Sequence, residues 1–222
     1  MEEYLVESFS EFHGVIESIR GKQNTICRGL KSVDYELKPS VGRFKPANPR
    51  AKHTSMEKKL LTLFKESALP HISYRPENDW EWLAVAQHHG LPTRLMDWSY
   101  NPLSAAYFAV EEEHDGDSAV YIFWGASTVS DFKGNPLDIN KVVRYRPPHV
   151  TPRIAAQAGL FTVHPNPEDA FSHKSMFRII IRRKARREIK RTLNKYGISR
   201  RHLFPGLDGI AHDLKWLQTS GY

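Results

Sequence analysis

The chain of 222 residues is 40% hydrophobic and 26% charged, a composition typical of a globular protein rather than a disordered one. It has no apolar run of the roughly 18 residues that a membrane span needs, and its acidic N-terminus lacks a signal-peptide pattern. Cys27 is alone, so no internal disulfide can form and a reducing compartment is expected. We therefore expect one cytoplasmic domain without a membrane partner, in which residues 1–24 form an N-terminal helix and residues 25–217 form the core.

The first half of the chain predicts helices joined by short extended segments. Ser8 is expected to cap a helix whose apolar residues follow helical spacing, and residues 25–28 read as a short strand. Thr54 and Glu57 have the spacing of a capping box at the start of a second helix. Further helices are expected between residues 78 and 90, capped by asparagine, and from residue 101, which precedes a proline.

The second half predicts strands over residues 93–98, 118–124 and 176–181 and helices over residues 184–196 and 207–217. The intervening loop of residues 125–149 is rich in glycine and proline, as functional or mobile loops often are. The final helix is expected to bury an apolar face made of Leu207, Ile210, Leu214 and Leu217. Because no internal repeat is present, a single α+β domain is the simplest interpretation.

The excess positive charge is concentrated in one short segment. Residues 182–201 contain ten Lys or Arg and one acid, a balance of +9, and the rest of the chain has 22 basic and 24 acidic residues, a balance of −2. A basic helix predicts a nucleic-acid or other polyanionic partner, but it is equally typical of a solvated helix face. The predicted nucleic-acid contacts are Arg183, Lys184, Arg186, Arg187, Lys190 and Arg191.

Residues 87–98 hold two histidines, an arginine, an aspartate and a tryptophan between two predicted helices. Polar side chains at such a junction indicate a binding or catalytic site. On a strand, Thr93 and Asp97 would share one face and Arg94 would point to the other. The alternative is a purely structural Arg94–Asp97 pair that braces the end of the strand.

A metal site is not expected in this segment. His88 and His89 are adjacent, so their side chains diverge by about 100° on a helix, and the chain has no metal-ligand spacing. One histidine is expected in the core or at a cap, and the other in the site. A metal-assisted nuclease that uses both histidines and Asp97 is therefore the last-ranked hypothesis.

Two other segments carry side chains suited to a ligand. Arg28-Gly29 could present an arginine fork to a diphosphate or carboxylate, although a surface arginine before a turn glycine explains the pair equally simply. Residues 153–161 pair Arg153 with Gln157 and suit a strand edge against which a ligand lies. Cys27 is conceivable as a nucleophile, but a lone cysteine in a strand is more often a small buried apolar residue.

Taken in order, these pieces resemble the FRG-domain family, named for a Phe-Arg-Gly motif. The resemblance extends from about residue 25 to about residue 217. Cys27 stands in place of the family's phenylalanine, and Gly206 stands where many relatives carry an aspartate. The matching segments are Arg28-Gly29 and residues 38–43, 87–109, 153–161, 203–205 and 207–209.

The resemblance implies an ADP-ribosyltransferase-like split mixed β-sheet with flanking helices, and NAD as co-substrate. It implies a cofactor site made of Arg28, Gly29, His88, His89, Thr93 and Arg94, and catalytic roles for Arg28, Asp97 and Gln157. No catalytic glutamate can be placed on the family's third motif, and a carboxylate would stabilise an oxocarbenium-like sugar. Asp97 and Asp208 are the substitute carboxylates.

The function expected from this resemblance is an NAD-dependent ADP-ribosyltransferase, a bacterial toxin or phage-defence effector that modifies RNA or DNA and has an antitoxin partner. The alternative hypothesis is a non-catalytic nucleic-acid or partner-binding module, in which the His-rich segment is a structural latch. Binding of NAD would separate the two, because only the first predicts a bound dinucleotide.

Overall fold

The computed structural model describes residues 1–19, 24–72, 74–129, 134–148 and 152–219. Within these ranges the strands are β1 (Glu2–Val6), β2 (Ile26–Leu30), β3 (Leu95–Ser99), β4 (Ser118–Phe123), β5 (Ser127–Thr128), β6 (Val143–Tyr145), β7 (Gly159–Val163) and β8 (Met176–Ile181). The helices are α1 (Phe9–Ser18), α2 (His53–Ala68), α3 (Asp79–His88), α4 (Pro102–Val110), α5 (Pro152–Ala156), α6 (Arg183–Lys195), α7 (Arg200–Leu203) and α8 (Leu207–Thr219).

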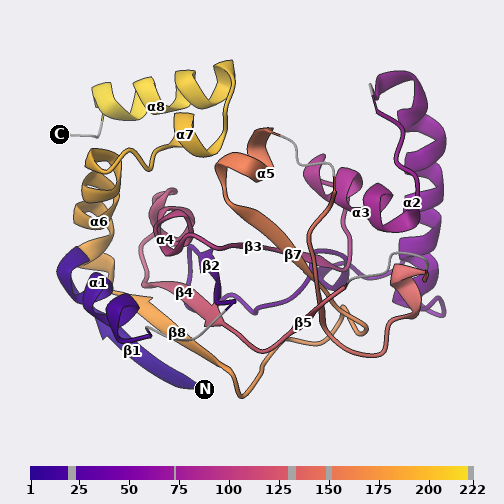
Figure 1. Cartoon of the computed structure of the whole chain (residues 1–222), viewed down its shortest axis with the longest axis horizontal. Helices are drawn as coiled ribbons and strands as arrows, with labels where there is room; N and C mark the ends of the chain where they lie inside the picture. The colour runs from indigo at the N-terminus through magenta and orange to yellow at the C-terminus, as the bar shows by residue number, and fades with distance from the viewer. Residues whose placement is uncertain (20–23, 73, 130–133, 149–151, 220–222) are drawn as a thin grey trace.

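The strands form one mixed sheet of eight strands in the order β1-β8-β4-β2-β3-β7-β6-β5. The two outermost pairs, β1–β8 and β5–β6, are parallel, and the pairs between them are antiparallel. In Figure 1, α1, α4 and α6 lie at one end of the sheet and α2 and α3 lie at the other. The α+β class expected from the sequence is confirmed.

Three helix starts follow the expected capping chemistry. The side chains of Ser8, Asn78 and Asn101 accept hydrogen bonds from backbone N–H groups in the first turns of α1, α3 and α4. Each cap satisfies a donor that has no partner within the helix. The expected capping box at α2 is wrong, because Thr54 lies inside the helix and Glu57 is buried against an arginine.

The N-terminal segment belongs to the sheet, so its description as a helix alone is wrong. β1 pairs with β8 along its whole length, from Glu2 opposite Phe177 to Val6 opposite Ile181. Only Val6 of β1 is buried, as expected for an edge strand with one covered end. This exposed and acidic pattern explains why the sequence did not indicate a strand.

Two further expectations about local structure are also corrected. The segment of residues 125–149 is not one long loop, since it contributes β5, β6 and the short 3-10 helix Pro136–Asp138. The segment of residues 153–161 is not a strand edge. Its first part is α5, and its second part begins β7, which lies inside the sheet between β3 and β6.

Two apolar clusters cover the same face of the sheet. One packs under α1, α4 and α6 against β2, β4 and β8, and the other packs under α2 and α3 against β3, β6 and β7. The boundary between them falls where β2 meets β3, which pair only through Cys27 and Ser99. Such limited pairing leaves the two halves of the sheet separated beyond this point. The opposite face carries a third apolar cluster, closed by Leu37 and Phe171 from loops.

The apolar face expected for α8 is not buried. Leu207 is 83% exposed, Ile210 42% and Leu214 48%. The helix packs on α7 through a different face, where Asp213 contacts Ser199 and Arg201. Figure 1 shows α8 at the outside of the molecule, above α6 and α7. Within the described ranges, no helix is both long enough and apolar enough to span a membrane.

Candidate functional site

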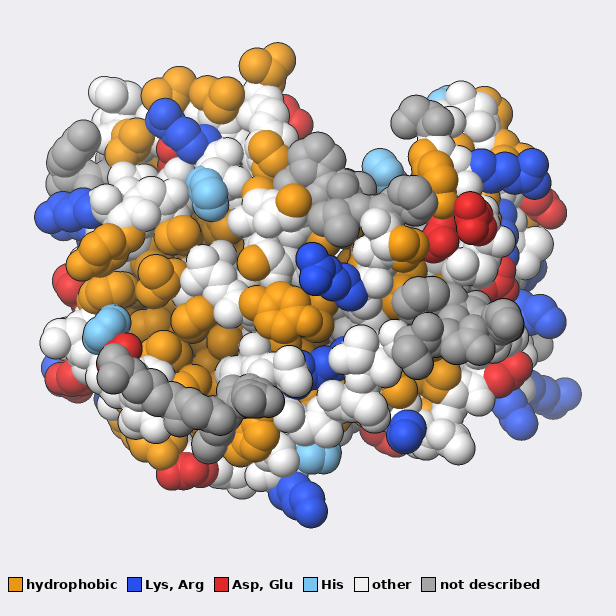
Figure 2. All heavy atoms as spheres, in the orientation of Figure 1, with side chains coloured by type: hydrophobic (Ala, Val, Ile, Leu, Met, Phe, Trp, Pro, Cys, Tyr) orange, Lys and Arg blue, Asp and Glu red, His pale blue; other side chains and the backbone are white. Residues whose placement is uncertain are grey.

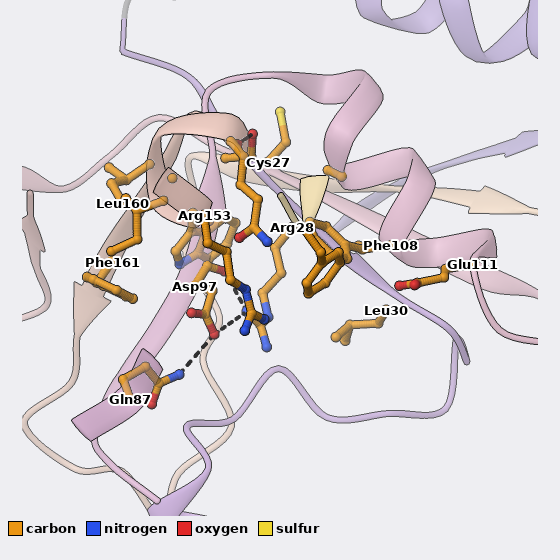
Figure 3. Close-up of a pocket in the computed structure, with 18 of the residues that line it drawn as sticks. Cys27, Arg28, Leu30, Gln87, Asp97, Phe108, Glu111, Arg153, Leu160 and Phe161 are labelled. Atoms are coloured by element: carbon orange, nitrogen blue, oxygen red, sulfur yellow. Dashed lines mark hydrogen bonds and ion pairs between the residues drawn. The ribbon is translucent and has the colours of Figure 1, made fainter. Parts of the chain in front are cut away.

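A cavity of about 560 Å³ opens where β2 and β3 separate. Its walls come from β2, β3 and β7, from the helices α4 and α5, and from the segment of α7. This volume lies within the range of about 300–1,000 Å³ that is typical of small-molecule sites. Figure 3 shows that side chains from these separate parts of the chain converge on one space.

Arg28 bridges the gap between the two strands. Its Nη1 donates to the backbone carbonyl of Asp97 and lies 3.5 Å from the carboxylate of the same residue. Its Nε is buried and has no hydrogen-bond partner among the described residues. Burial lowers the pKa of Arg28, opposed by the nearby Asp97, and the guanidinium stays charged at neutral pH. The predicted site arginine therefore does line the cavity.

Asp97 is held by a chain of hydrogen bonds that begins at Thr93. The hydroxyl of Thr93 accepts from the N–H of Leu95 at 3.0 Å and donates to Oε1 of Gln87 at 2.7 Å. Nε2 of Gln87 then donates to the Asp97 carboxylate at 2.9 Å. Gln87 therefore links Thr93 to Asp97, the two residues that the strand pattern predicted to share one face.

The structure changes the role expected for Thr93. Its side chain is buried outside the cavity lining, and its hydroxyl is fully engaged as donor and acceptor. Direct contact with a cofactor is therefore the wrong assignment. Gln87, which does line the cavity, was missed by the sequence analysis although it immediately precedes His88.

Arg94 is a core residue and not part of the site. It is fully buried, and its Nε and backbone N–H both donate to the carboxylate of Glu57, at 2.9 and 2.8 Å. Its Nη1 donates to the carbonyl of Leu137 at 3.1 Å. Burial raises the pKa of Glu57, while Arg94 acts in the opposite direction. Both expectations for Arg94, cofactor contact and a brace to Asp97, are wrong.

The two histidines separate as their spacing predicted. His88 lines the cavity, whereas His89 is exposed outside its lining, and their rings meet edge to face at 5.1 Å. Burial lowers the pKa of His88, so it is neutral at pH 7. Among the described residues, no group of three or more His, Cys, Asp or Glu side chains is arranged to hold a metal ion.

Cys27 and Gly29 serve packing. Burial raises the pKa of the Cys27 thiol to about 12, so the reactive thiolate is essentially absent at neutral pH. A Cβ on Gly29 would lie 1.9 Å from the carbonyl oxygen of Ala105 in α4. A glycine is therefore required here because α4 packs closely against β2. The close approach of a cofactor, which the sequence suggested as the reason, is not needed to explain it.

Gln157 lines the cavity, but its amide is already engaged. Its side-chain Nε2 donates to the carbonyl of Leu203 at 3.0 Å, and its backbone carbonyl accepts from the Ser99 hydroxyl at 2.6 Å. Glu111 also lines the cavity, is largely buried and pairs with Arg200. The sequence analysis missed Glu111 and proposed Asp208, which is exposed on α8 away from the cavity lining.

The cavity lining carries more positive than negative charge. Its five cations and three carboxylates leave a formal surplus of two positive charges. Three cations have a carboxylate within ion-pair distance in the same wall, so the surplus comes from the other two. The cations are Arg28, Lys31, Arg43, Arg153 and Arg200, and the carboxylates are Asp97, Glu111 and Glu112.

Fewer basic side chains of helix α6 are available to bind nucleic acid than its sequence suggests. Arg186 and Lys190 are buried and donate to backbone carbonyls at the end of α4, so their assignment to nucleic-acid binding is wrong. Arg183 pairs with Asp115, and Lys184 pairs with Glu7. On the face drawn in Figure 2, Lys and Arg side chains are scattered, with several over α2. The folded protein therefore does not concentrate its basic surface on α6 alone.

Comparison with known proteins identifies part of the chain. Neither the curated proteins nor the solved structures include a match to it. The family model for the FRG domain matches residues 23–118, which cover β2, α2, α3, β3, α4 and the start of β4. Arg28, Gln87 and Asp97 lie inside this segment, whereas Arg153, Gln157 and Arg200 lie outside it. Residues 23–118 thus match the FRG domain, as the motifs in the sequence indicated.

Proposed function

We propose that the protein is an NAD-dependent ADP-ribosyltransferase whose site is the cavity between β2 and β3. The observation that carries the proposal is the surplus of positive charge in a cavity of dinucleotide-compatible size. A diphosphate is the anionic part of NAD, and arginine forks bind phosphate oxygens bidentately. Arg28, which lines the cavity, would contribute through its charge.

Asp97 is the proposed carboxylate for the reacting ribose. It faces the cavity with 57% of its side chain exposed, and Gln87 and Arg28 fix its position. In the reaction, the bond between ribose C1′ and the nicotinamide nitrogen breaks, and the electron pair leaves with nicotinamide. The sugar acquires oxocarbenium character, which a nearby carboxylate stabilises, and an acceptor nucleophile then bonds to C1′ and loses its proton. Gln157, which also lines the cavity, would orient the ribose through its side-chain oxygen, since its Nε2 donates to Leu203.

The test is incubation with NAD labelled in its adenosine part, together with total RNA, DNA or protein. We expect label to enter one of these fractions with the wild-type protein and not with the Arg28→Ala variant. Arg75→Ala, which removes an exposed arginine outside the cavity lining, is the matched control and should retain activity. Full activity of a folded Arg28→Ala variant would remove this assignment.

The acceptor that we propose is a nucleic acid, reached through the outward-facing bases of α6. Arg183, Lys184 and Arg187 are exposed there, beside the partly buried Arg191. Contacts with phosphates weaken as salt rises, so salt-independent binding of RNA and DNA would exclude this part of the proposal. A cytoplasmic toxin or phage-defence effector with an antitoxin is the cellular role consistent with such an activity.

A non-catalytic binding module is the competing function. Calorimetry with NAD distinguishes the two, because only the transferase requires a bound dinucleotide.

A further inference from the structure

Arg153 differs from the paired cations of the cavity. Arg28, Lys31 and Arg200 each have a carboxylate within ion-pair distance. Arg43, the remaining cation, donates from Nε and Nη2 to the carbonyl of Lys38. Arg153 has no carboxylate within ion-pair distance among the described residues, although it lies in the cavity wall.

The guanidinium of Arg153 is held by an aromatic ring in place of an acid. Its Cζ lies 4.5 Å from the centroid of the Phe204 ring, and Arg200 contacts the same ring at 3.9 Å. Phe108 meets Phe204 edge to face at 5.9 Å, so the ring is itself fixed between α4 and α7. An aromatic face orients a guanidinium and leaves its edge N–H groups available as donors.

The side chain of Arg153 points toward two other residues of the cavity lining. Figure 3 shows Arg153 reaching from α5 toward the region of Asp97 and Arg28. Burial lowers the pKa of Arg153, and attraction to Asp97 acts in the opposite direction. Arg28 and Gln87 already contact Asp97 and partly compensate its negative charge. An anion that binds Arg153 would therefore be repelled less by this carboxylate.

We propose that Arg153, oriented by Phe204, is the principal arginine that binds the diphosphate of the dinucleotide. This inference rests on the proposed function and adds to it a binding residue from outside the matched FRG segment. Arg28, whose Nη1 is engaged by Asp97, then acts mainly as the bridge between β2 and β3. The ligand class is a diphosphate ester, with the planar guanidinium donating to one or both phosphates.

The experiment measures binding by calorimetry with ADP-ribose, inorganic pyrophosphate and adenosine as separate probes. We expect Arg153→Gln to weaken ADP-ribose and pyrophosphate binding at least tenfold, with adenosine binding unchanged. Arg153→Lys keeps the charge without the planar fork and should restore only part of the affinity. Arg75→Gln removes the same charge outside the cavity lining and should bind all three probes as the wild type does.

The outcomes separate this inference from the proposed function. Wild-type affinity of Arg153→Gln for ADP-ribose and pyrophosphate would overturn the role of Arg153 while leaving NAD binding intact. Binding of pyrophosphate but not ADP-ribose, lost in Arg153→Gln, would support the diphosphate site and reject NAD. Absence of binding of both probes to the wild-type protein would reject both. A melting curve for each variant confirms that the protein is folded.

Discussion

The side-chain amide of Gln87 donates a 2.9 Å hydrogen bond to the carboxylate of Asp97, joining the end of α3 to β3. The orientation of this amide agrees with the bonds of Thr93, whose hydroxyl accepts from a backbone N–H and donates its single proton to the side-chain oxygen of Gln87. With its oxygen facing Thr93, the amide must turn its NH₂ group toward Asp97. The buried Thr93 thus helps to fix the position of the Asp97 carboxylate through Gln87, without contacting Asp97 itself.

Removal of the Thr93 hydroxyl should therefore slow the proposed reaction. Thr93→Val leaves the amide of Gln87 free to rotate, and the loss of one net hydrogen bond of about 1 kcal/mol corresponds to roughly a five- to tenfold effect. We expect that decrease in the rate of NAD cleavage. Thr93→Ser keeps the hydroxyl and should remain close to the wild-type rate. Equal rates for the Val and Ser variants, both folded, would contradict the role of this hydrogen-bond chain.

The buried Arg94–Glu57 pair should be important for stability and not for ligand binding. Glu57→Gln removes the only carboxylate that contacts Arg94 among the described residues, and leaves a fully buried guanidinium uncompensated. Breaking a buried pair in this way costs about 3–5 kcal/mol. Urea unfolding should show this loss, and the double variant Glu57→Leu/Arg94→Met should recover much of it. A stability loss below about 1 kcal/mol in Glu57→Gln would show that the pair is not buried as described.

Two glycine-to-alanine substitutions should have opposite effects. A Cβ on Gly29 would overlap the backbone of α4, so Gly29→Ala must push strand and helix apart. Overpacking of this kind costs about 1–3 kcal/mol or more. Gly14 lies inside α1 with no atom within 4 Å of a new Cβ, so Gly14→Ala should stabilise by roughly 0.5–1 kcal/mol. Melting temperatures that move in the same direction for both variants would contradict this close contact.

His164 should make the protein less stable in mild acid. The Thr162 hydroxyl accepts from the indole N–H of Trp98 and lies 2.8 Å from Nε2 of the buried His164 ring. Burial, assisted by repulsion from Arg28 and Arg94, lowers the pKa of His164 to about 3. Between pH 6.5 and pH 3 the unfolded chain binds a proton that the folded protein does not. The free energy of unfolding should therefore fall as pH falls, by up to about 1.4 kcal/mol per pH unit.

The control for this pH dependence is His164→Asn, which removes the titrating ring. From pH 7 to pH 5, the wild-type protein should lose about 2 kcal/mol more than the variant does, and the two curves should run parallel above about pH 7.5. Urea unfolding at each pH measures the difference. Parallel curves over the whole range would show that His164 is not a buried neutral histidine.

Local features of the structure could be read from the sequence. Ser8, Asn78 and Asn101 cap their helices as expected, because a cap depends on residues only a few positions away. The strand at residues 176–181 agrees with its apolar β-branched pattern. The FRG motifs also marked Arg28 and Asp97, and these two residues do meet in the structure.

The tertiary structure alone decided which charged groups belong to the site. Glu57 has the sequence pattern of a helix cap, yet it binds Arg94, 37 positions away. Arg186 and Lys190 look like surface bases of α6, yet both donate to carbonyls of a distant turn. The apolar face of α8 looks like core, yet it is exposed. Periodicity specifies which face of an element is apolar or charged, whereas the partner of that face depends on which distant segments pack beside it.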